Sequence, residues 1–343
     1  MSPPMPRADR LALAVSSGAL ALPEAGAILV LRAVPSPFLD MVPRARLRCV
    51  QGFRPLHDSL LAAGHAVTAR PEPEAAGPAM VVVNLTRSRA ESLGNIALGL
   101  RALPPGGTLA VAGAKSEGVD AIARQVARAL PPAGTFVKAH GRVLWLVRPA
   151  ELPPAVDAWA AGAAPRRNAE GFLTAPGMFS PDHPDPGSRR LAAVLGGRLS
   201  GRVADLGAGW GWLAQAVLAA SPAIEALDLH EAEALALDAA RANVADPRAA
   251  FHWSDVTRLD GGPACDAVIT NPPFHQDRAA DPDLGAAFIA AAARLLKPAG
   301  QLFLVANRQL PYEAVLANAF REWDKLGEDG TYKVIHAARP RRT

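Results

Sequence analysis

The sequence predicts an α/β fold made of two tandem domains, each built around a mainly parallel sheet. The chain has 343 residues, which is more than one domain of ordinary size. In both halves, short apolar runs alternate with helix-like stretches, as in sheets whose strands are joined by helices. The phrase LPPGGTLAVAG at 103–113 also resembles LKPAGQLFLVA at 296–306, which suggests an internal duplication.

The first half carries six predicted strands and three predicted helices after its N-terminal segment. The apolar, β-branched runs predict strands at 27–33, 46–50, 79–85, 108–114, 135–139 and 142–147. Apolar residues at helical spacing predict helices at 55–64, 88–103 and 118–130.

The N-terminal stretch LALAVSSGALA at 11–21 has two interpretations. Arg7 and Arg10 precede this apolar run, which resembles the basic start and apolar core of a signal peptide. Asp9 lies among the basic residues, however, and Ser16-Ser17-Gly18 interrupts the run. An amphipathic helix leading into the first strand fits equally well, and no run is apolar for long enough to span a membrane.

The second half predicts one complete doubly wound domain. Residues 151–170 are rich in Pro, Ala and Gly without a clean period, so we expect a linker between a domain at 1–150 and a domain at 171–343. Predicted helices lie at 212–221, 231–244, 284–296 and 311–320. Seven strands are predicted, at 202–206, 224–229, 249–254, 265–271, 301–306, 323–328 and 332–338, the last two forming an antiparallel hairpin.

Charge is shared unevenly between the halves. The formal net charge is +4, but residues 1–170 hold 19 Lys and Arg against 12 Asp and Glu, whereas 171–343 hold 17 against 20. A basic half favours contact with a polyanion such as RNA, because Lys and Arg displace counterions from phosphates; a solvated arginine-rich surface is the alternative. The two cysteines lie far apart, which suggests neither a disulfide framework nor a cysteine metal site.

A glycine-rich turn, VADLGAGWGW, predicts a nucleoside site. Asp205, Gly207, Gly209 and Gly211 lie where an apolar strand ends and a helix begins, so the backbone can turn sharply and approach a ligand. Asp228, at the end of the next predicted strand, can accept the hydroxyls of a ribose. The glycine spacing differs from that of a dinucleotide pyrophosphate turn, and no phosphate-binding lysine follows, so we expect a nucleoside without a phosphate chain.

The tetrapeptide Asn271-Pro272-Pro273-Phe274 ends a buried strand at the edge of the sheet where ligands bind in such folds. The prolines fix the backbone, so the side-chain oxygen of Asn271 and the carbonyl of Pro272 can accept both hydrogens of one planar amine. Phe274 can stack on the attached ring. Alignment of the amine lone pair with an electrophile would account for most of the rate acceleration. No charged general base would be needed before the amine attacks.

These motifs resemble those of class I S-adenosylmethionine-dependent methyltransferases. PGMFSPDHPDPGSRRLAAVL ahead of the glycine turn, NPPFH and VANRQLPY narrow the resemblance to ribosomal RNA guanine-N2 methyltransferases of the RsmC and RlmG type, closest to the small-subunit RsmC type. The resemblance implies two Rossmann-like domains, an S-adenosylmethionine cofactor, and a degenerate N-terminal copy that grips RNA. In that copy Asn84 is followed by Leu85-Thr86 and no glycine turn is present.

The resemblance assigns further residues. Phe179 and Asp185 would line the cofactor site, and Pro273, Asp185 and Asn307 would lie near the target base. Asp255 follows the third strand and can accept from the adenine amine, or it only caps a turn. Asp185 or Ser188 alternatively caps the helix beginning near residue 189, and Asn307 alternatively serves a turn.

Two tryptophans and two histidines of the second half also need an interpretation. Trp210 and Trp212 either pack against the methionine moiety or cap the helix. His230 and His275 show no metal-ligand spacing, so no metal is expected.

The function predicted is therefore methyl transfer from S-adenosylmethionine to the exocyclic N2 of a guanine in 16S ribosomal RNA, by a cytoplasmic, monomeric enzyme. Other planar amines remain open as acceptors: a 23S guanine N2, an adenine N6 or a protein glutamine amide. A non-catalytic RNA-binding or ribosome-assembly protein is the alternative of a different class. The partners expected are ribosomal RNA or the small ribosomal subunit, and no membrane.

Overall fold

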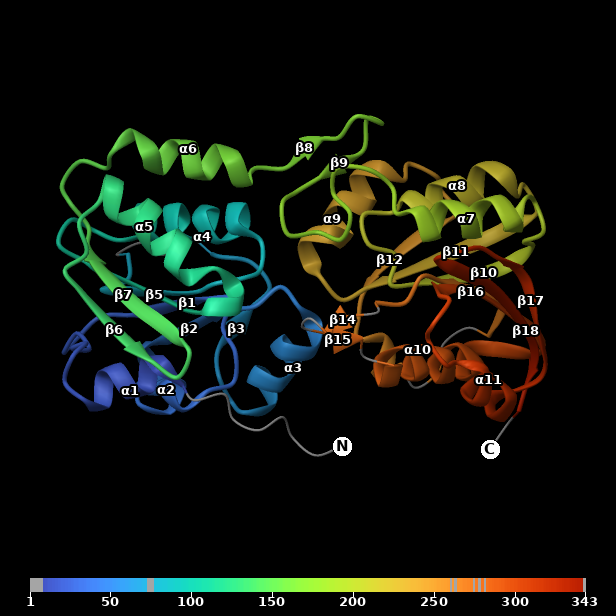
Figure 1. Cartoon of the computed structure of the whole chain (residues 1–343), viewed down its shortest axis with the longest axis horizontal. Helices are drawn as coiled ribbons and strands as arrows, with labels where there is room; N and C mark the ends of the chain where they lie inside the picture. Colours follow the sequence, from blue (N-terminus) through green and yellow to red (C-terminus); the bar gives the residue numbers. More distant parts are fainter. Residues whose placement is uncertain are drawn as a thin grey trace. The chain divides into compact units, whose positions relative to one another are not determined.

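The computed structural model describes residues 9–72, 77–259, 261, 264–273, 275–276, 279–280 and 282–341. The chain divides into two compact units. The first unit comprises 1–165 with 175–177, and the second unit comprises 166–174 with 178–343. Each unit has its own sheet and its own helices (Figure 1).

The first unit is built on a seven-stranded sheet of order β3-β2-β1-β4-β5-β7-β6. The pairs from β3 to β5 are parallel, and β7 is antiparallel to both of its neighbours. Its strands are β1 (Ile28–Leu31), β2 (Leu47–Val50), β3 (Val67–Thr68), β4 (Met80–Asn84), β5 (Thr108–Ala114), β6 (Gly134–Lys138) and β7 (Gly141–Val147). Its helices are α1 (Arg10–Ser16), α2 (Pro37–Asp40), η1 (Arg44–Arg46), α3 (Arg54–Ala62), α4 (Arg89–Ala102), η2 (Lys115–Glu117), α5 (Val119–Ala129) and α6 (Pro154–Ala163).

The second unit repeats this topology, with the order β12-β11-β10-β13-β16-β18-β17. Its large sheet contains β10 (Gly201–Leu206), β11 (Ile224–Glu231), β12 (Ala249–Trp253), β13 (Cys265–Thr270), β16 (Leu296–Asn307), β17 (Phe320–Glu328) and β18 (Tyr332–Pro340). Short pairs are formed by β8 (Arg166–Arg167) with β9 (Leu173–Thr174) and by β14 (His275–Gln276) with β15 (Ala279–Ala280). The helices are α7 (Pro186–Leu195), α8 (Trp212–Ala220), α9 (Ala234–Asn243), η3 (Val256–Arg258), α10 (Pro282–Leu295) and α11 (Glu313–Ala319). The predicted fold class, with a closing antiparallel hairpin, is confirmed.

The central strands are largely apolar because both faces of each sheet are covered by helices. In β4, Val81 and Val83 pack into one apolar cluster, whereas Met80 and Val82 pack into another. In β13, Val268 and Ile269 likewise belong to different clusters. Each unit therefore buries a core on both sides of its sheet, which holds the strand ends rigidly in place.

The N-terminal stretch forms a packed helix. Asp9 caps α1 by accepting hydrogen bonds from the backbone N–H groups of Leu11 and Ala12, and Leu11 and Ala14 are buried. This stretch thus forms the helix that the amphipathic-helix interpretation predicts.

Several segments differ from the prediction, α6 and β3 among them. Residues 154–163, inside the segment expected to be an irregular linker, form α6, which packs extensively on α4. Gly94 of α4 lets α6 approach closely, since an added Cβ there would collide with Ala163. Strand β3 is missing from the prediction because its two residues are too few to show an alternating pattern.

Candidate active site

The site of the second unit lies where β10 and β13 end side by side. These strands are parallel, with Leu206 paired in register with Thr270. The buried Thr270 hydroxyl donates to the Leu206 carbonyl at 2.7 Å and ties the two strand ends together. Gly207 and Asn271 therefore begin two neighbouring loops at the carboxyl edge of the sheet, where ligands bind in folds of this kind.

The loop after β10 is a tight turn that requires glycine. Gly207, Gly209 and Gly211 have φ angles of +78°, +55° and +87°, which side chains with a Cβ rarely adopt. At Gly211 an added Cβ would collide with α9, but at Gly209 it would meet no atom within 4 Å. The open space beside Gly209 is therefore available to a ligand.

Two carboxylates lie beneath this turn. Glu231, the last residue of β11, accepts hydrogen bonds from the backbone N–H groups of Gly209 at 2.8 Å and Glu233 at 2.7 Å. Asp205 is 1% exposed, and its Oδ2 has no hydrogen-bond partner among the described residues. Burial, reinforced by the charge of Glu231, raises the pKa of Asp205 to about 8, and burial also raises the pKa of Glu231. A cationic ligand group at this turn would relieve both effects.

Asp228, the predicted ribose acid, is engaged elsewhere. It lies three residues before the end of β11, paired in register with Ala204. Its carboxylate accepts from Arg202 at 2.6 Å and bonds to His252 at 2.9 Å, and these partners hold its pKa below the usual range despite burial. Glu231 is the acid that reaches the glycine turn. Sequence reasoning missed it because β11 runs to Glu231 and not to Leu229 as predicted.

The segment 179–188 forms the opposite wall of the site. The indole N–H of Trp210 donates to the Phe179 carbonyl at 2.9 Å, and the Trp210 ring packs against Phe172 at a centroid distance of 5.4 Å. Asn243 of α9 donates to the carbonyl of Trp210 at 2.8 Å. Trp210 thus anchors this wall to the glycine turn, a contact that sequence reasoning did not foresee, while the Phe179 side chain is 62% exposed.

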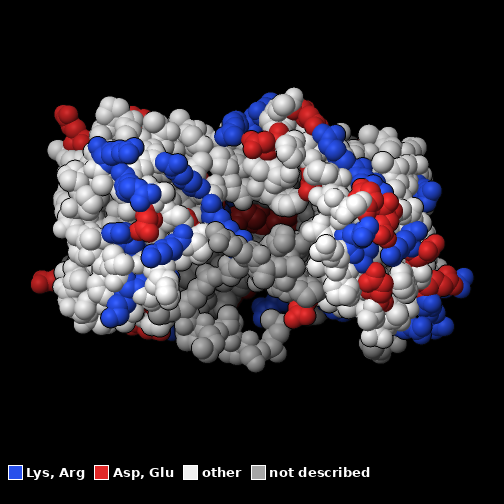
Figure 2. Space-filling view, viewed as in Figure 1, with Lys and Arg blue, Asp and Glu red and all other residues white. Residues whose placement is uncertain are grey.

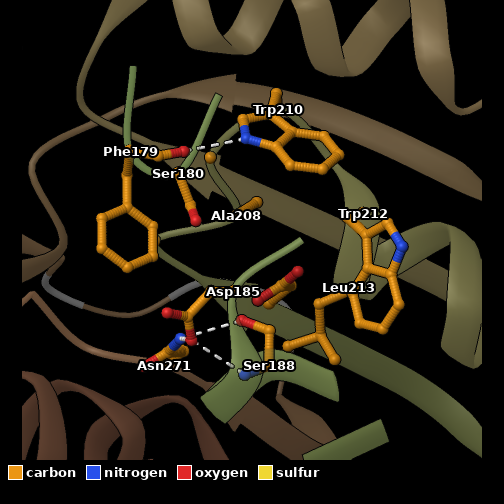
Figure 3. Close-up of a pocket in the computed structure, with 12 residues that line it drawn as sticks. Phe179, Ser180, Asp185, Ser188, Ala208, Trp210, Trp212, Leu213 and Asn271 are labelled. Carbon is orange, nitrogen blue, oxygen red and sulfur yellow. Dashed lines mark hydrogen bonds between the residues drawn. The ribbon is translucent and has the colours of Figure 1, made fainter. Parts of the chain in front are cut away.

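The Asn271 carboxamide is fixed by this wall (Figure 3). Its Nδ2 donates to Asp185 Oδ2 and to Ser188 Oγ, both at 2.8 Å, while its buried Oδ1 has no partner among the described residues. Asp185 also caps α7 by accepting from the backbone N–H of Ser188 at 3.0 Å. Asp185 therefore caps α7 and also lines the pocket, and its roles toward cofactor and base stay predictions.

The pocket brings together residues from three segments, at 179–188, 205–213 and 271, and encloses about 430 Å³ of space that includes open solvent. It is lined by Phe179, Ser180, Asp185, Ser188, Asp205, Gly207, Ala208, Gly209, Trp210, Trp212, Leu213 and Asn271.

Other predicted site residues stay predictions. Asp255 caps η3 through Thr257, and Asn307 ends β16 half-buried. Pro272 is buried and Pro273 is exposed. Phe274 lies outside the described residues.

Comparison with known proteins agrees with this geometry. The family model described as "Methyltransferase small domain" matches residues 170–336. The structure of the T. thermophilus 16S rRNA N2 G1207 methyltransferase (RsmC), in complex with AdoMet and guanosine, superimposes with a TM-score of 0.77 at 25% identity. The superposition covers 96% of this chain and 91% of that one. Fold and site together are those of an S-adenosylmethionine-dependent methyltransferase.

Two curated relatives show the family to which the chain belongs. Ribosomal RNA small subunit methyltransferase C of Chromohalobacter salexigens is 33% identical over 248 residues, covering 70% of this chain and 72% of that protein. The protein of the same name from Klebsiella pneumoniae is 32% identical over 251 residues, covering 71% and 70%. The chain belongs to the family of ribosomal RNA small subunit methyltransferase C.

Proposed function

We propose that this chain transfers the methyl group of S-adenosylmethionine to the exocyclic N2 of a guanine in 16S ribosomal RNA. The observation that carries the proposal is the orientation of Asn271. Its buried side-chain oxygen has no partner among the described residues and lines the same pocket as the glycine turn. An amine hydrogen of the target base would satisfy this oxygen.

The residues at the turn fit the cofactor. The open space at Gly209 allows a ligand to approach the backbone closely. The buried Oδ2 of Asp205, which has no partner among the described residues, would be satisfied by a hydrogen-bond donor or a cation. Glu231 lies at the strand end where a carboxylate can accept ribose hydroxyls, and Phe179 lies on the facing wall. These residues would hold S-adenosylmethionine, which supplies an electrophilic methyl group when bound.

The remaining chemistry belongs to this chain. Asn271 Oδ1 would accept one N–H of the guanine amine, the Pro272 carbonyl would accept the other, and Phe274 would stack on the base. Held in this way, the amine nitrogen would keep its lone pair directed at the methyl group. Its bond to the methyl carbon would form as the methyl–sulfur bond breaks, and its proton would pass to water at the solvent-open side of the pocket. Alignment of this kind can be worth roughly 7–11 kcal/mol.

The first unit would bind RNA. Figure 2 shows many Lys and Arg side chains over the visible face of this unit. Lys115, Arg124, Arg128 and Lys138 are exposed on η2, α5 and β6. Contacts from such side chains to phosphates would hold the RNA while the target base leaves its stack, at a cost of a few kcal/mol.

We further propose that the chain acts as a monomer in the cytoplasm. Among the helices that the structure describes, none combines the length and the apolar character that a membrane span requires.

Methylation of isolated RNA tests the function. Unmethylated 16S ribosomal RNA, as a transcript and as reconstituted small subunits, is incubated with the chain and S-adenosylmethionine, and its nucleosides are analysed by mass spectrometry. We expect N2-methylguanosine from at least one substrate. N6-methyladenosine would assign the chemistry to another acceptor, and no RNA product would contradict the proposal.

A further inference from the structure

The strongest feature that the proposed chemistry leaves unexplained is the pair Asp185 and Ser188, 86 and 83 residues before Asn271. A carboxamide has an oxygen and an NH₂ group of nearly equal size, so it can occupy its position in two orientations. Only one of them presents an acceptor to the pocket. The other would present two N–H donors to an amine that itself has N–H groups to donate.

The surroundings of Asn271 discriminate between these orientations. An ionised carboxylate only accepts hydrogen bonds, so Asp185 Oδ2, at 2.8 Å from Asn271, attracts Nδ2 and repels Oδ1. Ser188 Oγ lies at the same distance from Nδ2 and accepts its second hydrogen. Both donor hydrogens are thus used on the wall formed by α7, and the oxygen is left for the pocket.

The carboxylate is itself held rigidly. Asp185 Oδ2 accepts from the backbone N–H of Ser188, and Pro186 begins α7 with a fixed φ. Gly187 leaves room behind the carboxylate, because an added Cβ would lie 2.9 Å from Asp185 Oδ2 and 3.0 Å from the ring of Tyr332. The N-terminus of α7 therefore forms a preorganised acceptor pair aimed at one side-chain amide.

We propose that Asp185 and Ser188 are positioning residues that set the orientation of the Asn271 carboxamide, so that its oxygen and not its NH₂ group receives the target amine. This inference rests on the proposed function. It assigns to the helix cap a role in turnover that is separate from binding of the cofactor.

The first variant keeps the cap of α7 but no longer selects between the two orientations of the Asn271 carboxamide. In Asp185→Asn, the new side chain caps α7 about as well, but it can offer either an acceptor or a donor to Asn271. A hydrogen bond to a charged group contributes about 1.5–3 kcal/mol, so we expect kcat to fall about tenfold or more and the Kd for S-adenosylmethionine to change much less. Ser188→Ala removes one acceptor and should lower kcat less. Asp9→Asn, which changes the cap of α1 in the first unit in the same way, is the matched control and should keep wild-type kcat.

The decisive experiment exchanges the two groups. Asn271→Asp alone places two carboxylates in contact, whereas Asn271→Asp with Asp185→Asn restores a donor–acceptor pair in reversed order and again leaves one oxygen facing the pocket. Rates on unmethylated 16S ribosomal RNA are measured at about pH 8, where exposed carboxylates are ionised. We expect the double variant to be about tenfold or more faster than Asn271→Asp.

A double variant below that margin, or one that no longer binds S-adenosylmethionine in calorimetric titration, would overturn the inference. The wild-type rate in the same assay reports separately on the proposed function. An inactive wild-type chain contradicts the function, whereas an active wild type with no rescue contradicts only the role of Asp185 and Ser188.

Discussion

The two units have the same sheet order, yet the carboxyl edges of their sheets differ. In the second unit, Gly207 follows β10 and Asn271 follows β13; at the matching register positions of the first unit stand Arg32 and Asn84. Arg32 has a φ of +53°, so the backbone still turns as it does at Gly207, whose φ is +78°. The backbone geometry is therefore shared, and the side chains differ.

In the first unit these side chains have partners within the unit. The Arg32 guanidinium forms an ion pair with Glu91 of α4, and Thr86 donates to the other oxygen of Glu91 at 2.9 Å. Asn84 Nδ2 donates to the Arg32 carbonyl at 3.1 Å. In the second unit, by contrast, the buried acceptors Asp205 Oδ2 and Asn271 Oδ1 have no partner among the described residues. The carboxyl edge that forms the pocket is thus distinguished by buried polar atoms to which no described residue of the chain hydrogen-bonds.

The largest effect is expected from the asparagine that follows β13 in the second unit, whose counterpart ends β4 in the first. Asn271→Ala removes the acceptor for the amine, and removal of one positioned hydrogen-bonding group from an active site costs about 100-fold to 1,000-fold in kcat. The Kd for S-adenosylmethionine should not change. Asn84→Ala, its counterpart in the first unit, should keep wild-type kcat in the same methyl-transfer assay. Equal losses in both variants would contradict a division of roles between the units.

A second large effect is expected at the glycine turn. Gly209→Ala forces a Cβ into a left-handed conformation, at about 1–2 kcal/mol, and directs it into the open space assigned to the cofactor. We expect the Kd for S-adenosylmethionine to rise about tenfold or more in calorimetric titration. Gly106 of the first unit has a φ of +84° and equally open surroundings, so Gly106→Ala carries similar strain. The comparison fails if Gly106→Ala weakens cofactor binding as much.

A smaller effect separates Glu231 from Asp228. Glu231→Gln weakens the acceptor assigned to the ribose and should raise the Kd for S-adenosylmethionine about tenfold, as expected for a hydrogen bond to a charged group. Asp228→Asn breaks the contacts with Arg202 and His252, so it should lower the free energy of unfolding by about 1 kcal/mol and leave the Kd unchanged. If Asp228→Asn weakened binding of S-adenosylmethionine and Glu231→Gln did not, Asp228 would be the residue that binds the ribose.

The last effect concerns the pH dependence of stability and not activity or cofactor binding. Asp205 has a pKa of about 8 in the folded chain against 3.8 as its ordinary value, so the folded state keeps a proton that the unfolded state releases. The free energy of unfolding contributed by this group therefore falls as pH rises from about 4 to 8, by at most about 1.4 kcal/mol per pH unit. Thermal unfolding of Asp205→Asn should be less sensitive to pH across this window than that of the wild type. Identical pH profiles would contradict the shifted pKa.

Much of the fold follows from local pattern. Apolar runs such as 79–85 and 265–271 must lie inside a covered sheet, and the glycines at 207, 209 and 211 occupy φ values that few other residues accept. Asn271 and Asp205 were predicted at the site because both follow or end such runs, and the structure places both in the pocket.

Two features of the site could not be predicted from the sequence. One depends on where a strand ends, and the other depends on contacts between distant segments. The end of β11 decides whether Asp228 or Glu231 reaches the glycine turn, and three polar or charged residues near one strand end look alike in sequence. The contact of Asn271 with Asp185 and Ser188 joins segments more than 80 residues apart, so no local period reports it.

The most direct test of the account is the nucleoside composition of 16S ribosomal RNA treated with the wild-type chain and with Asn271→Ala, under conditions in which calorimetry shows that both bind S-adenosylmethionine. We predict N2-methylguanosine with the wild-type chain and almost none with the variant. N2-methylguanosine formed at equal rates by both proteins would contradict the central claim that the unpartnered oxygen of Asn271 receives the target amine.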